Sequence, residues 1–452
     1  MTTVQPFNAI RYKISPKADL SSRICPPYDV LTQDDKDRLL AADPHNFVRI
    51  DLPHVPPKAA GPRHVYFEAA NLFRTWLAEG VLEREQQPAI YPVAHTFPYA
   101  GKTLTRIGMF ARVQIEEPGN SILPHEQTFS GPREDRRALF EATLANLSPV
   151  FFLATDSTGQ LAQLLAQRAT SAQQLADAQF DTGKLTLRRD EDPKIHQTIQ
   201  AILQSEKLII ADGHHRYSTS LTYQNALKAL SRSPLPAEHP ANHVLAYIVS
   251  MADPGLLVLP THRLIHTPPV APDALQQLVG DRFQYVQLPP AASPDEVLAN
   301  LQRLGPGFFG LYFPAQRTWA ALKLRSPDLL RKLEPDRSQP WAELDLAALH
   351  RVLITDILQP AVLAGTEPTI DYIKDINHAL QQAQQTGGLL AAMQPVSLPH
   401  LTRVCDSGDL MPQKSTYFYP KIPTGLLVYD LTPRGLPDQP PHQPPAADPV
   451  SA

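Results

Sequence analysis

The segment Leu208–Tyr217 constrains the fold of this chain most, because an apolar strand meets a helix there across a single glycine. Leu208–Ala211 is an apolar run of strand length, and the apolar residues that follow recur with helical spacing at Tyr217, Leu221, Leu227 and Leu230. Gly213 is therefore expected to form the turn between the strand and the helix. Such a junction points unpaired backbone N–H groups and the positive end of a helix dipole at one place, which favours phosphate or carboxylate.

Polar side chains at this turn strengthen the prediction of an anion site. His214 and His215 add donors, and Arg216, expected to face solvent, can make a paired hydrogen bond to a phosphate. The alternative is an ordinary turn with Asp212 as a helix cap and exposed histidines. Two histidines and an arginine within six residues favour the functional interpretation.

Length and composition limit the class of protein. A chain of 452 residues exceeds the roughly 250–300 residues of a single core, so two or three domains are expected. Net charge is −4 without a basic run, so binding to nucleic acid is not expected. Two distant cysteines, Cys25 and Cys405, fit a reducing cytoplasm, and no apolar stretch approaches the roughly 20 residues of a membrane span. We expect a cytoplasmic protein without a membrane partner.

Hydrophobic periodicity predicts an α+β protein whose strands and helices form layers around one sheet. Alternation from Ile107 to Ile115 indicates a strand with one buried face, and 156–185 reads as a polar, Gln/Ala-rich helix. The expected regions are an N-terminal α+β region at 1–155, the phosphate-binding-turn region of the same core at 156–269, a small α+β insertion at 270–335, a C-terminal region of helices and strands at 336–430, and a disordered proline-rich tail at 431–452.

A loop supplies a candidate base upstream of the turn. Glu126 follows His125 in Pro124–His125–Glu126, outside regular structure, and is a plausible general base for a hydroxyl. The loop lacks the second histidine of a zinc-protease helix, and the chain has no Walker loop, dinucleotide-binding glycine run or nucleophile elbow. Metal ligands are left unassigned.

Two further polar loops hold candidate binding residues. Leu259–Arg263 follows a strand-like run, and Lys414 with Ser415 is placed to contact phosphate, although a surface turn explains these two equally well.

Five separated motifs in this order resemble the domain-of-unknown-function 1015 family, over about residues 5–430. They are Pro27–Val30, His125–Thr128 with Asp135–Arg136, Ala211–Tyr217, Leu259–Arg263 and Lys414–Lys421. The family name implies no activity.

A more distant resemblance joins Asp212–Arg216 to the phosphate-binding turn of the ParB/sulfiredoxin-like fold, and most closely to its free serine kinases. It implies a ParB/sulfiredoxin-like mixed sheet core, ADP or ATP with Mg²⁺ as cofactors, and phosphoryl transfer between an adenine nucleotide and serine or O-phosphoserine in serine biosynthesis. Glu126 and Asp212 are then catalytic, with Glu126 similar to the base of those kinases.

Phosphoryl transfer needs bound phosphates and a positioned acceptor, which suggests binding roles for the remaining polar residues. The nucleotide phosphates are assigned to Gly213, His214, His215, Arg216, Lys414 and Ser415. The substrate is assigned to His125, Arg136, His262 and Arg263, and the choice between Arg136 and Arg263 for an amino-acid carboxylate stays open.

Two other functions remain as alternatives. A metal-dependent phosphoserine phosphatase would gather a metal from His125, Glu126, Asp212, His214 and His215 to activate water. A ParB-like nucleotide switch or nucleic-acid-binding protein is disfavoured by the acidic net charge.

Overall fold

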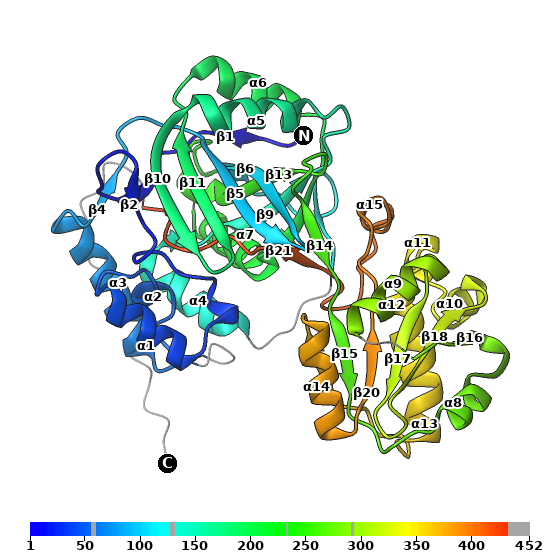
Figure 1. The fold of residues 1–452 in the computed structure, drawn as a ribbon. Coiled ribbons are helices and arrows are strands. Elements are labelled where there is room, and N and C mark those ends of the chain that lie inside the picture. The colour runs from blue at the N-terminus through cyan, green and yellow to red at the C-terminus, as the bar shows by residue number, and fades with distance from the viewer. Residues whose placement is uncertain (56–59, 127–131, 232–233, 291–292, 433–452) are drawn as a thin grey trace, which may run out of the picture. The chain divides into compact units, whose positions relative to one another are not determined.

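The computed structural model describes residues 1–55, 60–126, 132–231, 234–290 and 293–432. The chain divides into two compact units. Unit 1 comprises residues 1–122, 129–255 and 420–452, and unit 2 comprises residues 123–128 and 256–419. Each unit is therefore built from segments that lie far apart in the sequence (Figure 1).

Unit 1 is organised around a large mixed sheet with the strand order β3-β10-β11-β5-β6-β13-β9-β12-β7, to which β1 adds through β6. The pairs β9–β13 and β3–β10 are parallel, and the other pairs with a defined register are antiparallel. Its strands are β1 (Val4–Gln5), β3 (Ala18–Asp19), β5 (Tyr91–Tyr99), β6 (Lys102–Gln114), β7 (Ile122–Pro124), β9 (Val150–Ala154), β10 (Gln173–Phe180), β11 (Gly183–Arg189), β12 (Leu208–Asp212) and β13 (His243–Ser250).

Both faces of this sheet are buried at its centre. On one face, Met109 and Val113 of β6 belong to a core that includes Leu161 and Leu203 from the covering helices. On the other face Arg106 is fully buried and lies over the rings of Phe151 and Tyr247, at 5.2 and 5.6 Å from their centroids. The prediction that this strand buries only one face is therefore wrong, because β6 is a central strand covered on both sides.

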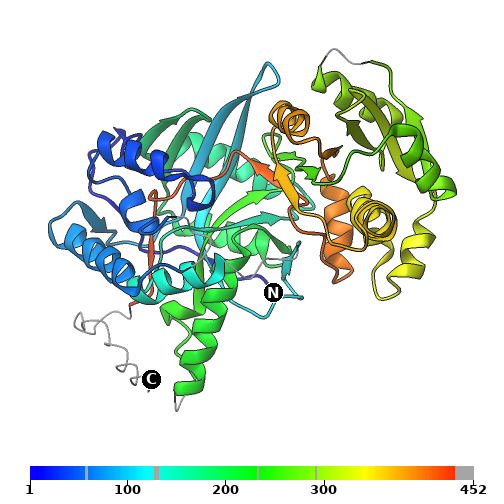
Figure 2. The same cartoon turned by 90° about the horizontal axis from the view of Figure 1, so that it is seen from below.

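The helices of unit 1 lie in two groups (Figures 1 and 2). α5 (Gln160–Ser171) and α6 (Pro193–Leu203) pack over the sheet, whereas α1 (Gln33–Ala42), α2 (Val48–Asp51), α3 (Arg63–Ala78) and α4 (Pro132–Thr143) pack on one another. α4 also packs on α7 (His214–Leu230). The remaining elements are η1 (Tyr28–Val30), η2 (Pro240–Asn242), and the strand pairs β2 (Ile10–Tyr12) with β4 (Leu82–Arg84) and β8 (Ala145–Asn146) with β22 (Tyr429–Asp430).

The helix predicted over 156–185 is wrong in its second half. α5 ends at Ser171, and β10 and β11 then form an antiparallel hairpin across the turn at Asp181–Thr182. Leu175, Ala176 and Ala178 are buried in β10. These small and apolar residues pair with neighbouring strands, so the tertiary sheet overrides the helical preference of a Gln/Ala-rich sequence.

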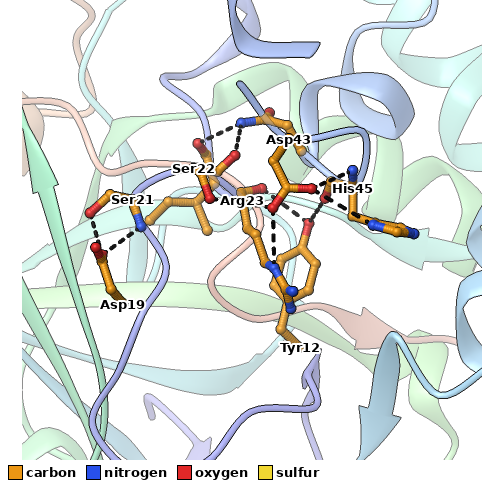
Figure 3. A network of polar contacts seen from close by, with 9 residues as sticks. Tyr12, Asp19, Ser21, Ser22, Arg23, Asp43 and His45 are labelled. Carbon is orange, nitrogen blue, oxygen red and sulfur yellow. Dashed lines mark hydrogen bonds and ion pairs between the residues drawn. The ribbon is translucent and has the colours of Figure 1, made fainter. Parts of the chain in front are cut away.

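A polar network holds the N-terminal segment that leads to Tyr28 (Figure 3). The Tyr12 hydroxyl donates to the carbonyl oxygens of Arg23 and His45, at 3.0 and 2.6 Å. The Asp43 carboxylate accepts from the His45 N–H at 2.8 Å and pairs with the Arg23 guanidinium at 3.4 Å. Asn46, fully buried, donates to the carbonyls of Ser22 and Ile24.

Unit 2 contains a six-stranded antiparallel sheet with the order β16-β18-β17-β20-β15-β19. Its strands are β15 (His262–Ile265), β16 (Phe283–Gln287), β17 (Phe309–Phe313), β18 (Thr318–Leu324), β19 (Ile370–Ile373) and β20 (Leu389–Ala392), with β14 (Leu257–Leu259) and β21 (Tyr417–Tyr419) in a separate pair. The helices are α8 (Pro272–Val279), η3 (Gly280–Arg282), α9 (Pro294–Leu304), α10 (Pro327–Leu333), α11 (Gln339–Ala342), α12 (Asp345–Ala347), a π-helical segment (Ala348–Leu358), α13 (Gln359–Ala361), α14 (Ile376–Thr386) and α15 (Leu398–Asp406).

The predicted α+β class is confirmed, and the predicted regions differ from the two units. Residues 270–335 supply β16, β17 and β18, but β17 pairs with β20 from the region after 336, so these residues share one sheet with the C-terminal region. Residues 433–452, the predicted tail after its first two positions, lie outside the described residues. Within the described part of the chain, no helix is long and apolar enough to cross a membrane.

We expect Asn46→Ala to destabilise unit 1. Besides its two donated bonds, the Asn46 side chain accepts from the Val48 N–H at 2.9 Å. Losing three buried hydrogen bonds of about 1 kcal/mol each lowers the free energy of unfolding by about 3 kcal/mol, measured by urea denaturation. Asn71→Ala, at an exposed asparagine of α3, is the control and leaves the free energy within about 0.5 kcal/mol. Equal effects of the two substitutions would contradict the anchoring role of Asn46.

Candidate functional site

The strand–glycine–helix turn is present as predicted. β12 ends at Asp212, Gly213 has φ +89°, and α7 begins at His214. A Cβ at Gly213 would lie 2.8 Å from Nε and 2.9 Å from Cζ of Arg216. The left-handed backbone thus favours glycine, and the missing Cβ leaves room for the Arg216 guanidinium.

Arg216 does not face open solvent, so that expectation is wrong. Its guanidinium pairs with the Asp212 carboxylate and donates to the Pro149 carbonyl, and the side chain is only 15% exposed. Asp212 is the last residue of β12 and Arg216 lies in the first turn of α7, so the turn at Gly213 brings the two charged residues together. Nε of Arg216 is buried and has no hydrogen-bond partner among the described residues. This N–H is therefore a donor that an added acceptor would satisfy.

Lys421 connects the turn to the N-terminal segment. Its ammonium donates to Asp212 Oδ1 at 3.1 Å and pairs with Asp29 Oδ2 at 2.5 Å. Burial alone would raise the pKa of Asp212, but Lys421 and then Arg216 outweigh it and hold that pKa below its usual range. Burial likewise opposes the charge of Lys421, yet Asp212 and Asp29 raise its pKa above the usual value. Asp212 and Lys421 are therefore both ionised at neutral pH.

Arg136 forms the second cationic centre of unit 1. It is buried and pairs with Asp135 at 2.5 Å and with Asp51, whose backbone carbonyl it also contacts at 2.7 Å. The Tyr28 ring lies beneath it, with the guanidinium carbon 4.1 Å from the ring centroid. Tyr66 fixes the outer Asp135 oxygen by donating its hydroxyl at 2.6 Å.

The two arginines line one small pocket of about 40 Å³ in unit 1. Its wall includes Asp51, Arg136, Arg216 and Thr219, closed by apolar residues such as Leu139. A volume of this order holds a few waters or one small anion. Burial raises the pKa of Asp51, and Arg136 and Arg216 oppose that rise, so both arginines act on the same carboxyl group.

The two histidines are half-buried at the first positions of α7. The charge of His214 contributes to lowering the pKa of Asp212. No side chain caps this helix, since its N-cap is Gly213. Both imidazoles therefore stand beside a positive helix end, as the sequence predicted, and their assignment to phosphate remains a prediction.

Unit 2 holds the predicted base. The Glu126 carboxylate accepts from the Ser415 backbone N–H at 3.3 Å and lies 3.7 Å from Nε2 of His125. His125 is fully buried, and its Nε2 is 2.8 Å from the Thr416 hydroxyl. The loop 411–416 thus holds Glu126 through backbone and side-chain contacts.

Arg263 fixes the other side of that loop. It is fully buried, donates to the carbonyls of Gln413 and Lys414 at 3.2 and 2.9 Å, and also to that of Thr261. Burial lowers the pKa of Arg263 to about 10, although Tyr372, Asp345 and Glu126 oppose this. Its guanidinium is used largely for holding backbone, and its assignment to a substrate carboxylate remains a prediction.

Three other predicted residues of unit 2 differ in exposure. His262 is buried, and its Nδ1 accepts from the Met393 N–H at 3.1 Å; burial and then Arg263 lower its pKa to about 4. Ser415 is buried and gives its hydroxyl to the Pro412 carbonyl, whereas Lys414 is exposed. Of these residues, only Lys414 presents its charged group to solvent.

The predicted residues thus fall into two sets, one in each unit. Asp212–Arg216 and Arg136 belong to unit 1, whereas His125, Glu126, His262, Arg263, Lys414 and Ser415 belong to unit 2. Four further residues of unit 1 were not predicted from the sequence, namely Tyr28, Asp29, Asp51 and Lys421. They contact Arg136 or Asp212 directly or, for Asp29, through Lys421. Together with Arg136, Asp212 and Arg216 they form the unit 1 cluster. The signal was present, because Tyr28, Asp29 and Lys421 stand in motifs that carry the family resemblance.

The sequence profile of the family described as "Protein of unknown function (DUF1015)" matches residues 4–347. The chain belongs to this family. The match ends before the Lys414–Lys421 motif, so it is shorter than the range of about 5–430 expected from the motifs. Among curated proteins, none matches this chain in sequence.

Solved structures give weak likenesses. A free serine kinase in complex with AMP is 10% identical with a TM-score of 0.34, covering 69% of this chain and 86% of that one. A conserved hypothetical protein from Pyrococcus furiosus is 12% identical, with a TM-score of 0.33 and coverages of 70% and 93%. SbnI with a C-terminal truncation, from Staphylococcus aureus, is 14% identical, with a TM-score of 0.32 and coverages of 68% and 83%.

We predict that Gly213→Ala disturbs the turn more than its backbone angle alone explains. Gly101→Ala is the matched control, since Gly101 has φ +73° and no atom within 4 Å of the added Cβ. The control lowers the free energy of unfolding by about 1–2 kcal/mol through the left-handed backbone. Gly213→Ala lowers it by about 1–3 kcal/mol more, because its Cβ displaces the Arg216 guanidinium. Equal losses in urea denaturation would show that the guanidinium moves aside freely.

Proposed function

We propose that this protein transfers a phosphoryl group between an adenine nucleotide and serine or O-phosphoserine, and forms serine from phosphoserine. The observation that carries the proposal is the Gly213 turn, where Arg216 lies against an uncapped helix start with one buried N–H unpaired. A helix start and a guanidinium are donors that suit phosphate oxygens. The resemblance of Asp212–Arg216 to the turn of the free serine kinases supports serine and O-phosphoserine as the partners of the nucleotide, and a ParB/sulfiredoxin-like core.

The charge pattern around the turn supports this role. Phosphoryl transfer requires bound phosphates whose charge is neutralised and an acceptor held in line. Arg216 and Arg136 line one pocket, and Lys421 stands on the other oxygen of Asp212. Because Asp212 has two cationic partners, a phosphate that draws Arg216 away leaves this carboxylate paired with Lys421.

In the direction that forms serine, O-phosphoserine gives its phosphoryl group to ADP. The bond between phosphorus and the serine oxygen breaks, a new bond forms from phosphorus to a terminal β-phosphate oxygen of ADP, and the serine oxygen takes up a proton. We assign that proton to Glu126, which would accept it in the reverse, kinase direction. This assignment comes from the sequence and is tested separately from phosphate binding.

The proposal includes a Mg²⁺ ion that the nucleotide phosphates would coordinate. Such an ion needs only one or two protein carboxylates, and Asp212 is the residue that would hold it. The phosphatase alternative would draw its metal ligands from both units, with His125 and Glu126 from unit 2 and Asp212, His214 and His215 from unit 1. In the part of the chain that the structure describes, no three His, Cys, Asp or Glu side chains lie close enough to hold a metal ion.

Arg216→Ala should weaken ADP binding at least about tenfold, because a hydrogen bond to a charged group contributes about 1.5–3 kcal/mol. Isothermal titration calorimetry measures the affinity, and circular dichroism confirms that the variant is folded. Arg38→Ala is the control, since Arg38 is 71% exposed on α1. Unchanged ADP affinity in a folded Arg216→Ala protein refutes the phosphate assignment.

Glu126→Gln should retain ADP binding and lose turnover of O-phosphoserine by roughly 10²–10⁴-fold, the usual contribution of a general acid or base. Glutamine preserves an oxygen that accepts from the Ser415 N–H, so the loop 411–416 keeps its contact. Serine release with and without ADP is the assay, and Glu367→Gln, at an exposed glutamate of unit 2, is the control.

The outcomes separate the candidate reactions. Serine formed only when ADP is present supports the transferase, and phosphate released without nucleotide supports the phosphatase. No serine under either condition, from folded protein, rejects both reactions. Joint loss of binding and turnover in Glu126→Gln would make Glu126 a ligand or a structural residue.

A further inference from the structure

Unit 2 contains a larger pocket that the proposed function does not use. It has a volume of about 530 Å³ and lies between the end of β18, the loop before β17 and the start of α15. None of the predicted catalytic or binding residues lines it. The volume falls within the roughly 300–1,000 Å³ of small-molecule sites.

Three cations line this pocket. The side chains of Lys323 and Arg325 make no ion pair or hydrogen bond to any residue that the structure describes, and Arg325 is exposed. Lys323 instead rests on the Phe308 ring, with Nζ 5.4 Å from its centroid. Arg403 pairs with Glu343 at 3.2 Å but stays 57% exposed. These N–H donors are available to an acceptor from outside the chain.

The wall beside Lys323 is held in place. Gln394 Nε2 donates to the carbonyls of Gly305 and Phe308, at 3.1 and 2.8 Å, which fixes the intervening loop. Gly307 in that loop has φ +82°, and a Cβ there would lie 3.3 Å from Cε of Lys323. The lysine stem therefore lies against a glycine that leaves it space. Fixed walls reduce the ordering cost of ligand binding.

The rest of the lining suits an acidic molecule with an organic part. Ser397 and His400 border the pocket at the first turn of α15, where the helix dipole favours an anion. Apolar wall is supplied by Pro306, Leu324 and Val396. The carboxylates on the wall are Glu343, which is already paired with Arg403, and Asp345.

We propose that this pocket binds an acidic small molecule of up to mononucleotide size, held through phosphate or carboxylate groups by Lys323, Arg325 and Arg403. The organic part would lie on the apolar wall. Since the cations recognise charge, phosphorylated and polycarboxylic ligands share this chemistry, and the probes below distinguish them.

The test is hydrogen–deuterium exchange of the full chain with AMP and with citrate. We expect one of the probes to protect the segments 322–326 and 394–403. The apparent Kd should rise at least about tenfold in Arg325→Ala and in Arg403→Ala, which alter exposed side chains and spare the fold. Arg331→Ala is the control, because Arg331 is 56% exposed on α10 outside the pocket.

Protection by AMP alone identifies a phosphorylated ligand, and protection by citrate alone identifies a polycarboxylate. Arg216→Ala in unit 1 should leave this protection unchanged, which keeps the result independent of the proposed phosphoryl transfer. The proposal is overturned if neither probe protects these segments, or if protection is equally strong in Arg325→Ala and Arg403→Ala.

Discussion

The arrangement of the unit 1 cluster depends on the two ion pairs that the Lys421 ammonium makes. This ammonium joins Asp29 from the N-terminal segment to Asp212 at the end of β12, and it comes from the C-terminal segment that re-enters unit 1 at Pro420. Without a cation there, the two partly exposed carboxylates would repel each other, an effect that solvent reduces but does not remove. The burial and the ionised state of Asp212 therefore require that these three segments assemble together.

Much of the fold can be predicted from the local sequence, because the spacing of apolar residues indicates which face of a helix or strand is buried. The strand, glycine and helix at Leu208–Leu230 appear as predicted. Prediction from the sequence fails where contacts between residues far apart in the sequence determine the structure. Arg106 looks like the polar side of β6, yet the aromatic rings of neighbouring strands cover it. The hairpin of β10 and β11 likewise forms because the sheet offers it partners.

The candidate site shows the same limit. Residue type and spacing identify the turn at Gly213, since a positive backbone angle before a helix favours glycine. Spacing does not reveal that Arg216 turns back onto Asp212, or that Arg136 is occupied by Asp51 and Asp135. The Arg136–Asp51 pair joins residues that are 85 positions apart, and nothing local in the sequence encodes it. Tyr28 and Lys421 were visible only as members of motifs.

Buried arginines play different roles in the two units, and their hydrogen bonds explain why. Arg263 gives its guanidinium to three backbone carbonyls and fixes the loop beside Glu126, so moving it would leave several carbonyls without a donor. Arg216 has one carbonyl and one carboxylate as partners, and that carboxylate has Lys421 as well. Releasing Asp212 therefore strands no buried charge. By this criterion Arg216 is suited to exchange its partner for a ligand, whereas Arg263 is suited to hold the chain in one position.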